Sequence, residues 1–166
     1  MCIRDRYNTN LYKNKVLKIV KEIPEVSIGA DVIVGFPGET DKLFNYTLNF
    51  IKDLPISYLH VFTYSERENT KAIKLEPVIP YEERARRSKI LRELSDKKRD
   101  HFYERSVGQI RPVLVEKSKN GILFGYTDNY IKTRIQGPIS LENTIQNVFI
   151  SEAKLGYVES EVVSIN

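Results

Sequence analysis

The stretch Gly29-Ala30-Asp31-Val32-Ile33-Val34-Gly35-Phe36-Pro37-Gly38-Glu39-Thr40 decides the fold of the N-terminal part of this chain. An apolar, β-branched run ends in Gly-Phe-Pro-Gly and is followed by a threonine suited to cap a helix. This order predicts a strand that enters a tight turn at the end of a parallel sheet, the edge at which α/β enzymes place their ligands. Because glycine has no side chain, such a turn can bring bare backbone close to a small ligand.

Helical and strand patterns alternate around this stretch. Apolar residues at helical spacing predict a helix over Thr9–Glu22, ended by Pro24, and a second over 41–54, ended by Pro55. Nearly continuous apolar runs predict strands over 26–34 and 58–64 that are buried on both faces. This alternation is typical of an α/β fold with a parallel sheet. Two strands alone leave open edges, which indicates part of a larger protein.

A polar loop over 65–80 precedes a long charged helix over about 81–106. The apolar positions of this helix are Ala85, Ile90, Leu91, Leu94, Phe102 and Tyr103. Both signs of charge fill the other positions. A solvated face with ion pairs one turn apart is favoured over a face that contacts RNA.

Beyond Gly108 the pattern changes to short alternating segments. Strands are expected over 111–116, 121–127, 130–135, 144–153 and 157–165, with turn signals at Asn120-Gly121 and Asp128-Asn129. Five short strands in about sixty residues predict a small all-β barrel. We expect the domain boundary at 106–109, which gives an α/β domain over 1–105 and a β-barrel over 106–166.

Composition narrows the chemistry of the 166 residues. A single cysteine excludes an internal disulfide framework, fits a reducing cytoplasm and excludes a cysteine-rich metal site built from this chain alone. The sequence has no apolar run long enough to span a membrane, and its charged first residues do not form a signal peptide. A net charge of +4 permits nucleic-acid binding without requiring it.

Five motifs occur in an order that points to one family. They are Arg6-Tyr7-Asn8-Thr9, the stretch from Gly29 to Thr40, Tyr58-Leu59-His60-Val61-Phe62, Tyr64-Ser65-x-Arg67 and Gly125-Tyr126-Thr127-Asp128-Asn129-Tyr130. In these motifs the chain resembles the radical S-adenosylmethionine methylthiotransferases from Arg6 onward. The closest branch is the MtaB type, which adds a methylthio group to C2 of threonylcarbamoyladenosine beside the tRNA anticodon.

The resemblance implies a three-part enzyme. Its N-terminal domain holds one 4Fe–4S cluster, its central partial (β/α) barrel holds a second through Cys-x-x-x-Cys-x-x-Cys, and its C-terminal TRAM barrel, which is OB-like, grips RNA. This chain matches only the end of the partial barrel and the TRAM barrel, so its implied partners are S-adenosylmethionine, the tRNA anticodon stem-loop and the remaining N-terminal portion of the same protein. The cluster ligands are absent, and Cys2 lies in a pentapeptide that departs from the family pattern. We therefore expect neither a metal ligand nor a catalytic residue in this chain, and no activity from it alone.

The resemblance implies that the turn and the second strand line the cofactor site. The candidate cofactor-binding residues are Gly35, Phe36, Pro37, Gly38, Glu39, His60 and Arg67. Each has a plainer interpretation: glycines also make turns, a strand histidine is often structural, and Arg67 is either an anchor for a carboxylate or phosphate or a surface charge. Thr40 is interpreted as a helix cap. Asp31, within the apolar strand, is either a polar group of the barrel interior or a structural carboxylate.

A second candidate site lies in the β-barrel. Aromatic rings stack on unpaired bases, and Lys and Arg side chains meet phosphates. The candidate RNA-binding residues are Lys117, Lys119, Tyr126, Asn129, Tyr130, Lys132 and Arg134. The alternative is that both tyrosines belong to the barrel core and that Asn129 only forms a turn.

Other functions stay open at this point. Related branches of the family act on isopentenyladenosine in tRNA or on an aspartate of a ribosomal protein. A stand-alone RNA-binding module, with no enzymatic role, is the alternative from another class. Iron and sulfide analysis of the protein discriminates the module from an enzyme.

Overall fold

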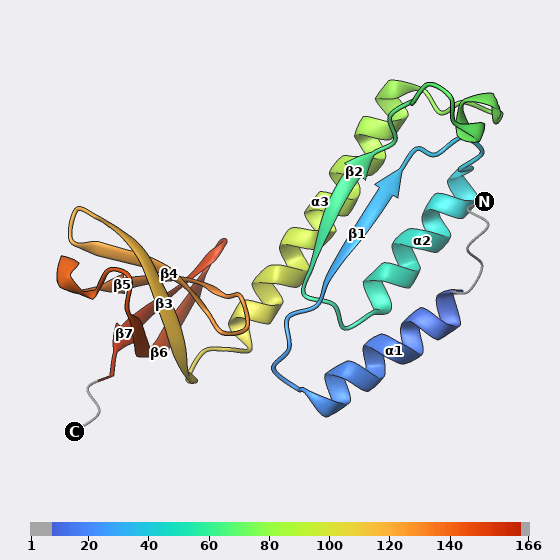
Figure 1. The fold of residues 1–166 in the computed structure, drawn as a ribbon. Helices are drawn as coiled ribbons and strands as arrows, with labels where there is room; N and C mark the ends of the chain where they lie inside the picture. Colours follow the sequence, from blue (N-terminus) through green and yellow to red (C-terminus); the bar gives the residue numbers. More distant parts are fainter. Residues whose placement is uncertain (1–7, 164–166) are drawn as a thin grey trace. The chain divides into compact units, whose positions relative to one another are not determined.

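The computed structural model describes residues 8–163, and the chain divides after Asp96 into two compact units. The Arg6-Tyr7 end of the first motif, Cys2 and the last residues of the final expected strand lie outside the described residues. The first unit contains α1 (Thr9–Glu22), β1 (Gly29–Val34), α2 (Asp41–Asp53), β2 (Tyr58–Thr63) and the short 3₁₀ helix η1 (Lys71–Lys74). Helix α3 (Tyr81–Glu104) begins in the first unit and ends in the second (Figure 1).

The helices of the first unit begin where the sequence predicts. The Asn8 side chain accepts a hydrogen bond from the amide of Leu11 at 2.8 Å, and the Thr40 hydroxyl accepts one from the amide of Leu43 at 3.3 Å. Each bond satisfies one of the backbone donors that a helix leaves free at its first turn. The prediction of Thr40 as a cap is confirmed.

Strands β1 and β2 pair in parallel, and all three helices pack on one face of this sheet. Asp31 lies opposite His60 and Ile33 opposite Phe62 in the register. The core comprises Val16 of α1, Phe44 and Ile51 of α2, Val34, Leu59 and Val61 of the strands, Leu91 of α3, and Leu54 and Ile56 between α2 and β2.

The other face of the sheet is open. Ile33 is 59% exposed and Phe62 is 52% exposed, so the prediction that both strands are buried on both faces is wrong. The reason is that the helices cover only the alternate residues, Ala30, Val32 and Val34 on β1, while Asp31 and Ile33 point away from them. Apolar residues on an uncovered face are typical of a sheet that another part of a protein completes.

Helix α3 buries charged residues as well as apolar ones. Arg84 and Arg87 are buried, whereas Ala85, expected on the apolar face, is exposed. The interpretation of α3 as a solvated charged helix therefore fails for its first turns.

No helix among residues 8–163 is long and apolar enough to cross a membrane.

The second unit is a closed five-stranded barrel, as predicted. Its strands are β3 (Ile110–Lys119), β4 (Ile122–Thr127), β5 (Lys132–Gln136), β6 (Ile145–Lys154) and β7 (Tyr157–Val162), with the 3₁₀ helix η2 (Ile139–Leu141) before β6. They close in the order β3-β4-β5-β7-β6, with β5 and β7 parallel and all other neighbours antiparallel. Alternate residues such as Val113, Leu123, Ile135 and Val148 fill the interior.

Strand β3 is longer than expected, and β5 starts later than expected. Strand β3 continues through a register shift between Val115 and Lys117. Strand β5 begins at Lys132 because a turn continues as far as Tyr130, whose φ is +69°.

The end of α3 groups with the barrel, so the second unit begins ahead of the predicted division at residue 106. Tyr103 packs with the buried residues Ile131, Ile150 and Val158. Its hydroxyl accepts a hydrogen bond from the amide of Lys132 at 3.3 Å. Its burial raises the pKa of this phenol.

Candidate functional site

The turn after β1 has two glycines in the left-handed region, but their surroundings differ. Gly35 has a φ of +76°, and a Cβ added there would lie 2.3 Å from Cγ of Arg84. Gly38 has a φ of +85°, and the nearest atom to an added Cβ would be the Glu76 carbonyl oxygen at 3.8 Å. Gly35 is therefore required both by backbone conformation and by packing, whereas Gly38 is required by backbone conformation alone and has open space beside its Cα.

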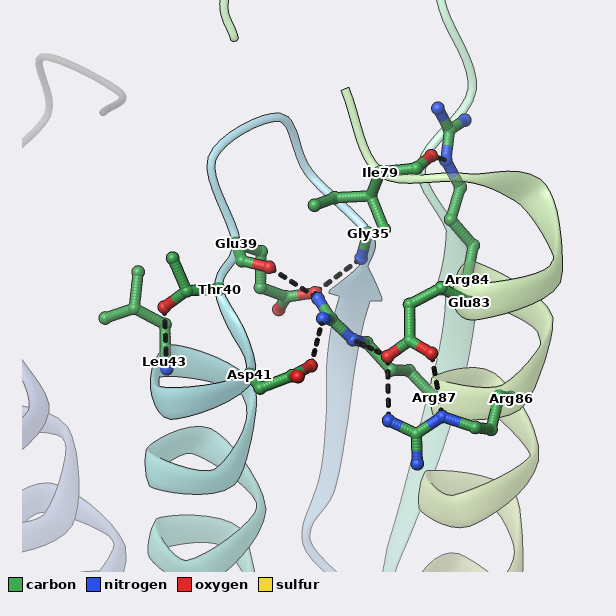
Figure 2. Close-up of polar contacts among 10 residues, drawn as sticks. All are labelled: Gly35, Glu39, Thr40, Asp41, Leu43, Ile79, Glu83, Arg84, Arg86 and Arg87. Atoms are coloured by element: carbon green, nitrogen blue, oxygen red, sulfur yellow. Dashed lines mark hydrogen bonds and ion pairs between the residues drawn. The ribbon is translucent and has the colours of Figure 1, made fainter. Parts of the chain in front are cut away.

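Glu39 folds back onto the start of the turn instead of facing outward (Figure 2). Its Oε2 accepts a hydrogen bond from the amide of Gly35 at 2.7 Å and a second from Nη1 of Arg87 at 2.9 Å. The side chain is only 14% exposed. Its carboxylate thus closes the turn onto itself.

Arg87 reaches from α3 to Glu39 at the end of this turn and to Asp41 at the start of α2. The guanidinium, with a side chain 3% exposed, donates to the Glu39 carbonyl oxygen at 2.6 Å and to Oδ1 of Asp41 at 2.8 Å. It also donates from Nε to Glu83 at 2.7 Å and lies 5.2 Å from the centre of the Phe44 ring. Burial opposes its charge, but the hydrogen bonds from Arg87 to Glu39, Glu83 and Asp41 outweigh that effect and raise its pKa.

Glu83 holds two arginines in place. Hydrogen bonds from Arg86 and from Arg87, together with their positive charges, lower the pKa of Glu83 to about 2. Arg86 makes two of these bonds, both at 2.7 Å, from a side chain that is 55% exposed. Arg87 is thereby fixed from its own helix as well as from the turn.

Arg84 joins the turn to the segment that follows β2. It donates to the carbonyl oxygens of Ile79 at 2.7 Å and Tyr64 at 3.0 Å, and it pairs with Glu66. The Tyr64 ring in turn meets the Phe36 ring edge-on, with 5.2 Å between centroids. The C-terminal ends of β1 and β2 are therefore held together as one edge.

Both buried arginines were missed by sequence reasoning. The available signal was their spacing of three residues near the start of α3, which places them on one helix face. That spacing does not by itself separate buried arginines from solvated ones, because the acceptors that hold them against the strands, such as Glu39 for Arg87 and Tyr64 for Arg84, are far away in sequence.

His60 lies on the open face of the sheet and Arg67 lies beyond it. His60 is exposed, and its ring meets the Tyr58 ring edge-on at 5.1 Å between centroids. Asp31, its neighbour on β1, is exposed on the same face. Arg67 is exposed in the following loop, where its carbonyl oxygen accepts a bond from the Thr70 hydroxyl at 2.8 Å. The structure thus gathers residues 35–39 into one turn, with His60 on the adjoining strand and Arg67 farther along the chain.

In the barrel, most of the candidate RNA-binding residues point outward from three adjacent strands. Across the β4–β5 pair, Tyr126 lies opposite Lys132 and Phe124 opposite Arg134. Across the β3–β4 pair, Lys117 lies opposite Phe124, and Lys119 is opposite Ile122. Phe124 was missed, although the alternation of residues 122–127 predicts that it shares the outward face with Tyr126.

The turn before β5 presents a tyrosine to solvent. Tyr130 is 69% exposed and contacts the half-buried Tyr126 ring, with centroids 5.2 Å apart. The interpretation of Tyr130 as barrel core is wrong, because its positive φ turns it out of the strand. Asn129 has the predicted turn role, since its side chain accepts a bond from the Thr127 hydroxyl at 2.7 Å.

The charge of this surface is partly neutralised. Arg134 forms an ion pair with Glu159 of β7 at 3.0 Å. Lys117, Lys119 and Lys132 are exposed. The surface thus combines three outward aromatic rings, those of Phe124, Tyr126 and Tyr130, with cations, the combination that suits a single-stranded nucleic acid.

Comparisons with known proteins find similarity in the barrel and along most of the chain. Residues 104–163 match the TRAM domain family. Threonylcarbamoyladenosine tRNA methylthiotransferase MtaB of Aquifex aeolicus (strain VF5) is 44% identical over 132 residues, which are 79% of this chain and 31% of that protein. The MtaB of Bacillus subtilis (strain 168) is 34% identical in an alignment of 168 positions that covers 98% of this chain and 37% of that protein.

A relative with a different name matches similarly. The tRNA-2-methylthio-N(6)-dimethylallyladenosine synthase of Endomicrobium trichonymphae is 35% identical over 158 residues, or 95% of this chain and 38% of that protein. The chain spans about a third of the length of these relatives. Its β-barrel is a TRAM domain, and over most of its length the chain is homologous to the tRNA methylthiotransferases of the MtaB and dimethylallyladenosine types.

Proposed function

We propose that this chain is the C-terminal part of a radical S-adenosylmethionine methylthiotransferase that modifies threonylcarbamoyladenosine beside the tRNA anticodon. The observation that carries the proposal is the 44% identity to an MtaB over 132 residues, 79% of the chain, which is longer than either unit and therefore extends into both. A free-standing RNA-binding barrel would not require homology in residues 8–96.

The α/β unit is proposed to be the end of a partial (β/α) barrel. Its two parallel strands have helices on one face and an exposed apolar face on the other, as expected of strands cut from a barrel. In that setting Asp31, Ile33, His60 and Phe62 line the barrel interior. Active sites of such barrels lie at the C-terminal ends of the strands, which is where the turn 35–39 lies.

The surface of the turn near Gly38 and Phe36 fits a contact with the cofactor. The open space beside Gly38 and the half-exposed Phe36 ring offer room and an apolar surface to an adenine or methionine group, while the Gly38 amide itself is held by the Pro77 carbonyl oxygen at 2.9 Å. His60 and Arg67 are the remaining candidates for cofactor contact. When bound and reduced by a cluster, S-adenosylmethionine supplies a radical that activates C2 of the modified adenine.

The two 4Fe–4S clusters do not fit this chain. Each cluster needs at least three cysteine thiolates, and the sequence contains one cysteine. The ligands must therefore come from the remaining N-terminal portion of the same protein. The chain by itself contributes part of the cofactor wall and the RNA grip.

The barrel is proposed to hold the tRNA anticodon stem-loop. Tyr126 and Tyr130 present rings on which unpaired bases can stack, and Lys117, Lys119 and Lys132 can meet phosphates. Arg134 contributes to this surface less freely because of its ion pair with Glu159.

Nucleoside analysis of tRNA tests the proposal. The complete enzyme, with the N-terminal portion restored, is expressed in a bacterial host that lacks its own methylthiotransferases, and digested tRNA is analysed by mass spectrometry. We expect 2-methylthio-threonylcarbamoyladenosine, and no product when the 166-residue chain is expressed alone.

The same experiment decides between the substrates. The similarity to the dimethylallyladenosine synthase over 95% of the chain is the observation that favours the second candidate. A product on dimethylallyladenosine instead of threonylcarbamoyladenosine would assign the chain to that branch. Iron-free complete protein that binds tRNA without modifying it would support the RNA-binding module.

A further inference from the structure

We propose that Arg87 is a positioning residue for the turn 35–39 and that it acts through Glu39. The importance of this turn for the cofactor rests on the proposed function, whereas the effect of Arg87 on the turn does not. Glu39 is then a bridge between Arg87 and Gly35 and does not itself contact the cofactor.

The first step of the argument is the bridging carboxylate. Oε2 of Glu39 accepts both the Gly35 amide, at 2.7 Å, and Nη1 of Arg87, at 2.9 Å. Gly35 begins the turn and Glu39 ends it, so this one oxygen fixes the separation of the two ends (Figure 2). An ionised carboxylate in this largely buried place needs a cationic partner, which Arg87 provides.

The second step is the shape of the guanidinium. Nη1 of Arg87 also meets the Glu39 carbonyl oxygen at 2.6 Å, and Nη2 meets Asp41 at 2.8 Å. Nε points the other way, to Glu83, at 2.7 Å. Only a planar fork of several donors reaches all of these acceptors together, and a lysine ammonium on its flexible stem does not.

The third step is what this arrangement leaves for a ligand. With the carboxylate of Glu39 turned inward, the outward part of the turn is the Phe36 ring and the backbone near Gly38. The amide of Gly38 donates to the Pro77 carbonyl oxygen at 2.9 Å, which holds this outward part against the segment after η1. Arg87 therefore determines the shape of a surface that it does not itself form.

Hydrogen exchange of backbone amides tests the effect of Arg87 in the 166-residue chain. We expect Arg87→Lys to raise the exchange rate of the Gly35 amide by roughly tenfold or more, as for the loss of a charge-assisted hydrogen bond. Glu39→Gln, which keeps the size of the side chain but not its charge, should act in the same direction. The internal reference is the amide of Leu59, which donates to the Ser95 hydroxyl at 2.8 Å and reports the stability of the same unit.

Arg86→Lys is the matched control. Arg86 lies next to Arg87 on α3 and shares the Glu83 carboxylate. Within residues 8–163, the side-chain hydrogen bonds given for Arg86 go to Glu83 and not to the turn. The control should leave Gly35 exchange within twofold of the starting protein. Equal acceleration of Gly35 and Leu59 in Arg87→Lys would mean that Arg87 only stabilises the unit, and unchanged Gly35 exchange in both Arg87→Lys and Glu39→Gln would overturn the proposal.

The consequence for the cofactor is measured separately in the complete enzyme. Arg87→Lys should raise KM for S-adenosylmethionine by roughly tenfold with a smaller change in kcat, as for a turn that binds less well but leaves the chemistry in place. Glu39→Gln should also raise KM, and Arg86→Lys should not. If Gly35 exchange rises while KM stays constant, the turn is positioned by Arg87 but its cofactor role in the proposed function is wrong.

Discussion

Gly35→Ala is expected to destabilise the first unit through two separable effects. The first is conformational, because an alanine at a φ of +76° lies in the left-handed region, at a cost of about 1–2 kcal/mol. The second is steric, because the new Cβ would lie 2.3 Å from Cγ of Arg84, a distance that real contacts do not reach. Arg84 must move, which would break one of its hydrogen bonds to the carbonyl oxygens of Ile79 and Tyr64.

The magnitude follows from those contacts. Each hydrogen bond from a charged donor contributes about 1.5–3 kcal/mol, so loss of one of the two, added to the conformational effect, predicts a total of about 2.5–5 kcal/mol. Gly38→Ala is the matched comparison, because it has the same kind of φ, +85°, but an open surrounding. It should reduce stability by only about 1–2 kcal/mol.

Urea unfolding followed by two-dimensional amide spectra measures both variants, because it resolves the first unit from the barrel. Barrel amides serve as the reference within each sample and should show one unchanged midpoint. Equal destabilisation by Gly35→Ala and Gly38→Ala would refute the argument that packing against Arg84 requires a glycine at residue 35. A Gly35→Ala variant as stable as the starting protein would refute the conformational argument as well.

Three further outcomes are expected. The pKa of Glu83 in the folded chain, about 2, lies below its ordinary value of 4.5, so its ion pairs stabilise the first unit above about pH 4.5 and this stability is lost as the pH falls toward 2. Acid titration should show a loss on the order of 1 kcal/mol, reduced from the full shift by solvent around Arg86, and Glu83→Gln should remove this pH dependence. Tyr130→Ala should weaken tRNA binding by about 1–3 kcal/mol with an unchanged melting temperature, whereas a lowered melting temperature would assign the ring to the fold. Lys132→Ala should reduce the salt dependence of tRNA binding by roughly one unit, and unchanged binding would remove this strand from the RNA surface.

Local patterns in the sequence were sufficient to predict the helices, the strands and the barrel that five of these strands form. Helix α1 begins and ends where Asn8 and Pro24 indicate, because caps and prolines act on their immediate neighbours. The barrel follows from alternation in short strands, since each strand buries every second residue against the same interior. Such information is contained within a few residues of the position it describes.

What could not be predicted depends on partners far along the chain or outside it. A buried Arg87 and a solvated one look alike in a charged helix, and its acceptor Glu39 lies 48 residues away. The apolar character of Ile33 and Phe62 indicated burial, but the described residues supply helices for only one face of the sheet. Apolar residues such as Ile33 and Phe62 fit the surroundings that they have in the whole protein. We propose that the remaining N-terminal portion supplies part of those surroundings.

In the turn after β1, some residues face the interior of the unit and others face outward. Only variants at the outward residues can test cofactor binding without altering the turn. Gly35 packs against Arg84 and Glu39 pairs with Arg87, so changing either residue alters the conformation of the turn. Gly38 faces outward with nothing nearer than 3.8 Å to an added Cβ. Gly38→Val in the complete enzyme should therefore lower S-adenosylmethionine affinity in a protein that stays folded, because the branched side chain covers the open backbone. Unchanged affinity in that folded variant would show that the outward part is only a turn.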